Sequence, residues 1–204
     1  HPPERVRFWL LDSYRRSLAP LQGLPHVRRY AVYGQPELDA ALTELAETLR
    51  TRDGHEALPL EIVIMDDYHL LGDQPAVKEQ LKRHVLADES RGFRLVAGLL
   101  AGTTRGYDSF LETLKMSQSG MAVGSANLMD DVASFEVLLP AHLAKLKLPP
   151  GRALLYRQGH RALVQIAYAG ESVDGWVARL QAAHGGRPAE TDNSVEYRQM
   201  TTSA

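Results

Sequence analysis

The sequence predicts an α/β fold with a mostly parallel β-sheet flanked by helices and an antiparallel edge near its C-terminal end. Short apolar segments rich in β-branched residues alternate with segments that have the three-to-four spacing of amphipathic helices. Strands separated by single helices form parallel sheets with right-handed crossovers. Two of the apolar segments end in a carboxylate, at Asp12 and Asp66, so we expect acidic side chains at strand ends.

The length and composition are those of one ordinary globular domain. The chain has 204 residues, of which 44% are hydrophobic and 24% charged, and it contains no apolar run of the roughly 18 residues that span a bilayer. A net charge of -2 gives no overall attraction to nucleic acid or anionic lipid. The absence of cysteine excludes disulfides and thiolate chemistry. The eight histidines show no spacing typical of metal ligands.

The first half of the chain predicts three strands and the helix between the last two. We expect the strands at residues 5–11, 29–33 and 60–65, which are short and mainly apolar. The helix follows Pro36, where apolar residues recur on one face, at Leu38, Ala41, Leu42, Leu45 and Leu49.

The middle of the chain continues the same alternation. Pro75 is placed to open a helix, residues 93–100 form a near-continuous apolar strand, and a helix is expected over 107–116. Residues 121–124 are a further candidate for a core strand. These segments extend the predicted parallel sheet.

The last third predicts a hairpin and a short helix. The apolar runs 153–157 and 163–167 flank Gly159 at hairpin spacing, which indicates an antiparallel edge on the sheet. A short helix is expected over 173–180. Residues 187–204 are polar and without periodicity, so we expect one domain over 1–186 and a flexible tail over 187–204.

The segment from Leu60 to Tyr68 is the most informative for function. An apolar strand there ends in two adjacent carboxylates, Asp66 and Asp67. In nucleotide-hydrolysing α/β folds an acid at this place holds Mg²⁺ and a following acid polarises the attacking water, a pattern called Walker B. The same pattern also occurs where a core strand enters a solvated loop or where an aspartate caps the next helix. On this motif alone both interpretations stay open.

Six markers occur in one order over residues 3–168 and together carry a family resemblance. They are a strand ending in Asp12-Ser13-Tyr14-Arg15-Arg16, then Met65-Asp66-Asp67-Tyr68, Gly92-Phe93-Arg94-Leu95-Val96, the segment Ser119 to Ser125, Leu148-Pro149-Pro150-Gly151-Arg152, and Val164-Gln165-Ile166-Ala167. This set resembles the FtsK/SpoIIIE-type motor ATPases, and most closely the C-terminal ATPase domain of the EccC-type motor of bacterial type VII secretion.

The resemblance implies a RecA-like fold of the P-loop NTPase type, with ATP and Mg²⁺ as cofactors of the intact parent protein. It implies a domain that works as an ATPase motor, or as a regulatory or substrate-docking domain, in a translocase on the cytoplasmic side of the cell membrane. The implied partners are the other ATPase domains of the motor, small helical-hairpin substrates, and further copies in a ring. Asp66 would be the Mg²⁺ acid, and Asp67 would stand where many members carry a glutamate that activates water.

The phosphate-cradling loop of these ATPases is absent from the 204 residues. Its pattern, Gly-x-x-x-x-Gly-Lys-Ser/Thr, does not occur. The resemblance places this Walker A unit ahead of His1, so we expect either a piece of a longer protein or a degenerate domain. In both cases this chain alone is expected to bind ATP poorly and to be inactive.

One more candidate site residue, Arg105, and two alternative functions are also expected. The resemblance places Arg105 near the sensor residues that contact nucleotide phosphates, although an arginine in a Gly-Thr-Thr-Arg-Gly turn is also typical of a solvated loop. One alternative function is an FtsK-like DNA translocase motor, for which the charge balance gives no strong sign. The other is a degenerate platform that holds neighbouring domains without nucleotide.

Overall fold

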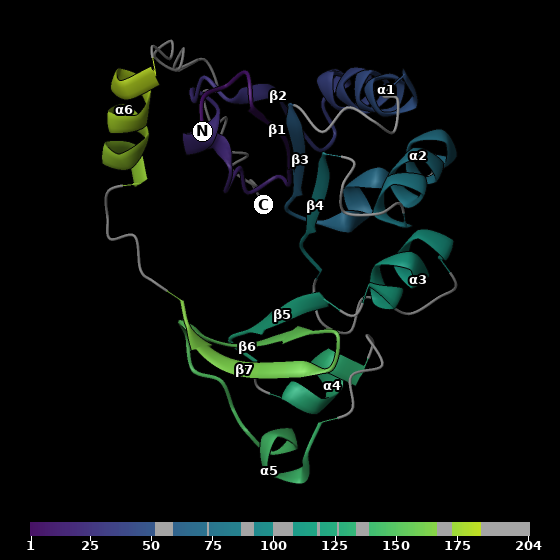
Figure 1. Cartoon of the computed structure of the whole chain (residues 1–204), viewed down its shortest axis with the longest axis vertical. Helices are drawn as coiled ribbons and strands as arrows, with labels where there is room; N and C mark the ends of the chain where they lie inside the picture. Colours follow the sequence, from purple (N-terminus) through teal and green to yellow (C-terminus); the bar gives the residue numbers. More distant parts are fainter. Residues whose placement is uncertain are drawn as a thin grey trace, which may run out of the picture.

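The chain forms two β-sheets. The computed structural model describes residues 1–51, 59–72, 74–86, 92–99, 108–117, 119–125, 127–133, 139–166 and 173–184. The first sheet is parallel, with the order β2-β1-β3-β4. Its strands are β1 (Val6–Asp12), β2 (Val27–Val32), β3 (Leu60–Met65) and β4 (Phe93–Ala97). The second is antiparallel, with β5 (Ser119–Val123), β6 (Arg152–Arg157) and β7 (His160–Gln165) (Figure 1). The predicted α/β fold class is confirmed.

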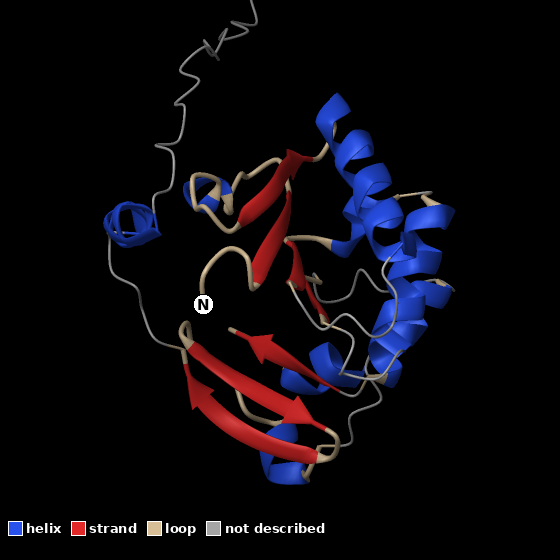
Figure 2. Cartoon of the chain, turned by 45° about the horizontal axis from the view of Figure 1, so that its top comes forward, coloured by secondary structure: helices blue, strands red, loops and turns tan. Residues whose placement is uncertain are grey.

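The helices lie on both sides of the parallel sheet. Its first face carries α1 (Pro36–Thr51), α2 (Pro75–Leu86) and α3 (Ser109–Met116), and the other side carries α6 (Val173–His184), which packs against the 3₁₀ helix η1 (Ala19–Leu21) (Figures 1 and 2). Along the sheet order β2-β1-β3-β4, the connection from β1 to β2 runs in one direction, and the connections from β2 to β3 and from β3 to β4 run in the other. Right-handed connections that run in opposite directions place their helices on opposite faces of the sheet.

The main core lies between the first face of the parallel sheet and the helices α1 to α3. Alternate residues of the strands point into it, including Trp9, Leu11, Val63 and Met65. The apolar stripe of α1 meets them, and all five residues predicted for that stripe are buried, at Leu38, Ala41, Leu42, Leu45 and Leu49. The three-to-four spacing thus identified the helix face correctly.

A smaller core lies beneath the antiparallel sheet. Leu154 and Tyr156 of β6 pack with Leu128 and Val132 of α4 (Leu128–Ala133) and with Leu148. The one-turn helix α5 (Ala141–Ala144) lies on the same side (Figure 1).

Two details of the predicted sheet are wrong. Residues 121–124 were expected as a core strand of the parallel sheet, but β5 pairs antiparallel with β6, and Met121 and Val123 are exposed. The hairpin β6–β7 is confirmed, yet it belongs to this separate sheet rather than to an edge of the parallel one. Periodicity describes which side of a strand is apolar and does not identify the strand that it pairs with. The predicted tail over 187–204 lies outside the described residues.

Candidate functional site

The candidate site lies where the strands of the parallel sheet end. After β1 the chain forms β2 on one side, and then returns to form β3 on the other side of β1. Ligands of open α/β sheets bind at the carboxyl ends of the strands where the strand order reverses in this way. Asp12 ends β1 and Asp66 follows β3, so both predicted carboxylates lie at this edge.

Asp66 is held between the two strands by its backbone. Its N–H donates to the carbonyl oxygen of Leu11 at 2.9 Å, which continues the pairing of β3 with β1 beyond Met65. The side chain is half-buried, and the described residues offer its carboxylate no hydrogen bond or ion pair. The backbone of Asp66 is therefore fixed at this edge, and its carboxylate is available to a cation.

Gly98 allows β4 to end directly against Asp66. Its N–H donates to the carbonyl oxygen of Met65 at 2.7 Å, and its own carbonyl oxygen accepts from the N–H of Tyr68 at 3.0 Å. A Cβ atom at this position would lie 2.1 Å from the backbone oxygen of Asp66. Only glycine permits this approach, so Gly98 helps to fix the turn that carries both aspartates.

Replacing Gly98 with alanine is expected to lower the free energy of unfolding by about 3 kcal/mol, since the added methyl group meets backbone and forces β4 and Asp66 apart. Urea denaturation measures this loss. Gly124→Ala is the control, because φ is +58° there but nothing lies within 4 Å of an added Cβ, so it should cost only about 1 kcal/mol. Equal losses in the two variants would contradict the close contact at Gly98.

Asp67 has a structural role in addition to the predicted chemical one. Its Oδ1 accepts from the backbone N–H of His69 at 2.9 Å and so caps the 3₁₀ helix η2 (Tyr68–Leu71). The capping interpretation of the double aspartate is thus correct for Asp67. Its second oxygen has no partner among the described residues, which leaves one oxygen that could orient a water.

Tyr68 is a core residue. Its ring is buried in the main core, and burial raises the pKa of its hydroxyl, with a further contribution from the charges of Asp108 and Asp67. The described position gives Tyr68 a packing role.

The carboxylate of Asp12 is hydrogen-bonded to the loop that follows it and to Tyr30 of β2. The carboxylate is fully buried and accepts from the N–H of Leu18 at 2.9 Å and from the hydroxyl of Tyr30 at 3.0 Å. Burial and the adjacent Asp12 raise the pKa of Tyr30. Asp12 therefore shapes the loop, which leaves Arg15 and Arg16 exposed, and it is not available as a metal ligand.

The described residues contain only some of the side chains expected to bind Mg²⁺ and phosphate. Among the described residues no group of three or more histidine or acidic side chains could hold a metal. Asp66 alone still fits Mg²⁺, which is commonly held by one or two carboxylates together with water and substrate phosphates. Arg105, predicted near the phosphates, lies outside the described residues.

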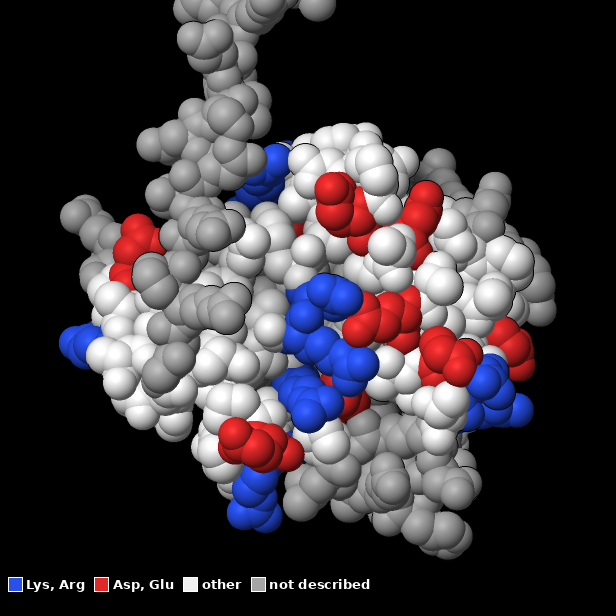
Figure 3. Space-filling view, turned by 90° about the horizontal axis from the view of Figure 1, so that it is seen from above, with Lys and Arg blue, Asp and Glu red and all other residues white. Residues whose placement is uncertain are grey.

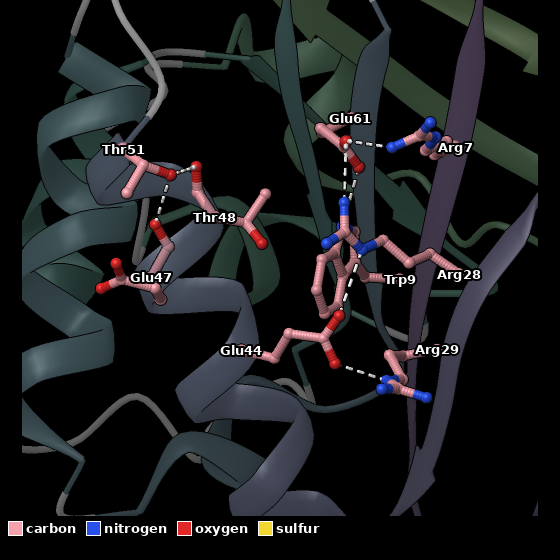
Figure 4. A network of polar contacts seen from close by, with 9 residues as sticks. All are labelled: Arg7, Trp9, Arg28, Arg29, Glu44, Glu47, Thr48, Thr51 and Glu61. Atoms are coloured by element: carbon pink, nitrogen blue, oxygen red, sulfur yellow. Dashed lines mark hydrogen bonds and ion pairs between the residues drawn. The ribbon is translucent and has the colours of Figure 1, made fainter. Parts of the chain in front are cut away.

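A second polar cluster lies on the α1 side of β1, β2 and β3 and was not identified from the sequence. Glu61 of β3 accepts from Trp9 Nε1 at 2.9 Å and forms ion pairs with Arg7 and Arg28 (Figure 4). Arg28 also pairs with Glu44 of α1, and an open hollow that Arg28 and Glu44 help to line runs along that helix.

This cluster has a balance of charges that points to a structural role. Seen from above, a group of basic side chains near the centre of the view is bordered by acidic ones, and other basic side chains lie apart from it (Figure 3). The side chain of Glu61 is 2% exposed, and Arg7 and Arg28 balance its charge. The cluster therefore holds β1, β2 and β3 together. The hollow does not include Asp66.

Comparisons with known proteins identify the fold. No protein-family model matches the chain, and no curated protein matches its sequence. Among solved structures, "EssC (ATPases 2 and 3)" from Geobacillus thermodenitrificans matches 91% of this chain and 39% of its own, with a TM-score of 0.67 and 18% identity. EccC (ATPases 2 and 3) of Thermomonospora curvata, in complex with a signal sequence peptide, matches 91% of this chain and 38% of its own, with a TM-score of 0.62 and 16% identity.

A third structure agrees with these two. The cytoplasmic domain of the Thermomonospora curvata type VII secretion ATPase EccC matches 88% of this chain and 24% of its own, with a TM-score of 0.62 and 20% identity. The chain thus spans about two fifths or less of the length of these structures. No helix among the described residues is long and apolar enough to cross a membrane. The resemblance carried by the ordered markers is confirmed at the level of the fold, which this chain shares with the ATPase domains of EssC and EccC.

Proposed function

We propose that this chain is an ATPase domain of a type VII protein secretion motor, and that its Asp66 holds the Mg²⁺ of a bound ATP. The observation that carries the proposal is the position of Asp66. In a fold shared with the EssC and EccC ATPase domains, its backbone is fixed at the carboxyl edge of the sheet, and its carboxylate has no partner in the described residues.

Each of the described residues at this site has its own proposed role. Asp66 holds the cation, Gly98 and the pairing to Leu11 fix its backbone, and the second oxygen of Asp67 orients a water. Mg²⁺ neutralises charge on the transferring phosphate when it is bound. The backbone N–H groups and lysine that cradle phosphates must come from a segment other than these 204 residues, since the required pattern is absent.

The proposed partners are those that the family resemblance implies. We expect the domain to contact the other ATPase domains of its motor and to act on small helical-hairpin substrates at the cytoplasmic face of the membrane, as one unit of a ring. A signal sequence peptide is part of one matched EccC structure, which supports a substrate-docking use of the fold.

A nucleotide-independent platform is the second candidate function. Two observations favour it, because Asp67 already caps η2 and no phosphate loop occurs in the chain. The DNA translocase has no comparable support, since the net charge is -2.

An export assay in cells that carry the intact motor separates these functions. The proposal predicts that Asp66→Asn and deletion of this domain both stop export of the motor's protein substrates. Loss of export on deletion but normal export with Asp66→Asn would favour the platform and contradict the role of Asp66. Normal protein export in both variants would contradict a role in secretion.

A further inference from the structure

Residues 139–166, which form α5, β6 and β7, are strongly basic, and we call them the basic segment. The segment contains no aspartate or glutamate, whereas the whole chain has a net charge of -2. Its lysines and arginines are Lys145, Lys147, Arg152, Arg157 and Arg161. All of these side chains are exposed, and all but Arg157 form no ion pair with any described residue. A local excess of positive charge of this kind attracts an acidic partner.

β7 is the edge strand of the basic segment. In the sheet order β5-β6-β7, β7 pairs only with β6 among the described residues (Figure 1). The pairing is regular over all six residues of β7. The parallel sheet differs at its edge strand β2, where a register shift interrupts the pairing with β1, and such a bulge protects an edge from further pairing. The edge of β7 has a regular backbone that a further strand can join.

The hairpin geometry determines which backbone groups of β7 face this open edge. Gln158 and Gly159 form the two-residue turn, both with positive φ. The residues that flank such a turn bond to each other, and bonded positions then alternate along the strands. The N–H of Ile166 donates to the carbonyl oxygen of Gly151 at 2.8 Å, as this alternation requires. The backbone groups that face outwards therefore belong to Arg161, Leu163 and Gln165.

The side chains along the edge combine positive charge with an apolar surface. Arg161 and Leu163 lie on the face that covers the smaller core, because they are opposite Tyr156 and Leu154. Leu163 is nevertheless 46% exposed, since no strand lies on its other side within the described residues. A strand added here would place one residue beside Arg161 and another, two positions along, beside Leu163. Opposite charges and apolar pairs stabilise such neighbours, so an acidic and an apolar residue fit these two places.

This distribution of charge favours an extended acidic segment over other partners. A flat lipid surface would meet one face of the hairpin, whereas the cations lie on both, with Arg152 and Arg161 on one face and Arg157 on the other. Single-stranded nucleic acid binds to exposed aromatic side chains, and the only tyrosine, phenylalanine or tryptophan of the basic segment, Tyr156, is buried. A second copy of β7 would bring like charges together.

We infer that the open edge of β7 binds an extended, acidic segment of a partner protein as an added β-strand. Backbone hydrogen bonds to Arg161, Leu163 and Gln165 hold the added strand, and the positive charge of the basic segment selects carboxylates. The inference concerns the antiparallel sheet alone and does not depend on the proposed role of Asp66.

The test measures binding of a fluorescently labelled peptide, which repeats Glu-Glu-Val-Val twice, to the intact protein that contains this chain. The same peptide methylated on its backbone nitrogens should bind about tenfold more weakly, because it cannot donate hydrogen bonds to β7. Arg161→Glu should also weaken binding about tenfold, since it replaces an attraction with a repulsion. Arg83→Glu is the matched control, because it makes the same change of charge at an exposed position of α2, and it should leave binding unchanged.

Hydrogen exchange at residues 161–165 should slow when the unmethylated peptide is bound. Equal binding of the methylated and unmethylated peptides would overturn the inference, and this comparison needs no change in the protein. Equal binding by the parent protein and Arg161→Glu would overturn it as well. Binding to phosphatidylserine vesicles or to oligothymidylate, without binding of the peptide, would also overturn it and assign the basic segment to lipid or to nucleic acid.

Discussion

Replacing Asp66 with alanine is expected to lower Mg²⁺-dependent ATP turnover at this site of the intact motor by about a hundredfold or more, since a bound Mg²⁺ contributes several kcal/mol to stabilising transition-state charge. Stability should change by less than about 0.5 kcal/mol, because the half-buried carboxylate has no partner among the described residues. Steady-state turnover, measured with the other ATPase sites disabled, tests the first expectation, and thermal unfolding tests the second.

The Asp67→Asn variant tests the proposed chemical role of Asp67 separately from its role as a helix cap. Asparagine also caps helices, so η2 should persist in this variant while the negative charge proposed to orient the attacking water is lost. A fall in turnover at unchanged stability would show that Asp67 acts in the chemistry as well as in the cap. Unchanged turnover in Asp66→Ala itself would contradict the Walker B assignment.

Replacing Glu61 with alanine is expected to lower the free energy of unfolding by about 1–3 kcal/mol, the cost of leaving a buried hydrogen-bond donor without its acceptor. The variant leaves Trp9 Nε1 without its acceptor and removes the carboxylate that faces Arg7 and Arg28. Urea denaturation followed by tryptophan fluorescence measures the loss directly, since Trp9 itself reports on this cluster.

Glu44→Ala is the control for the Glu61 variant. Glu44 also pairs with Arg28, but its side chain is 32% exposed, so its removal should cost less than about 1 kcal/mol. If both variants lost the same stability, burial would not be what makes Glu61 important.

Local patterns in the sequence predicted the parts of the fold that depend on local geometry. The stripe from Leu38 to Leu49 is buried because residues three and four apart lie on one face of a helix. The strand ending at Asp66 was predicted because its apolar run is short and β-branched. The pairing of β5 with β6 could not be predicted in this way, because the partner strand lies 29 or more residues further along the chain.

The candidate site was predicted only in part, for the same reason. Asp66 and Asp67 follow a strand and so could be identified, and the double aspartate also allowed a cap, which Asp67 provides. Gly98 and Glu61 were not singled out. The contact of Gly98 with Asp66 and the meeting of Glu61 with Trp9 and Arg28 arise only when separate strands are brought side by side.

Calorimetric titration of Mg²⁺-ATP is the most direct test of the claim that this chain is part of a nucleotide-binding domain. The titration uses the intact motor protein with its other ATPase sites disabled, and compares it with the Asp66→Ala variant. We expect the intact protein to bind Mg²⁺-ATP at this site, and the binding to be lost when Mg²⁺ is withheld or Asp66 is replaced by alanine. Failure of the intact protein to bind Mg²⁺-ATP at this site would contradict the nucleotide-binding function and favour a docking platform that works without nucleotide.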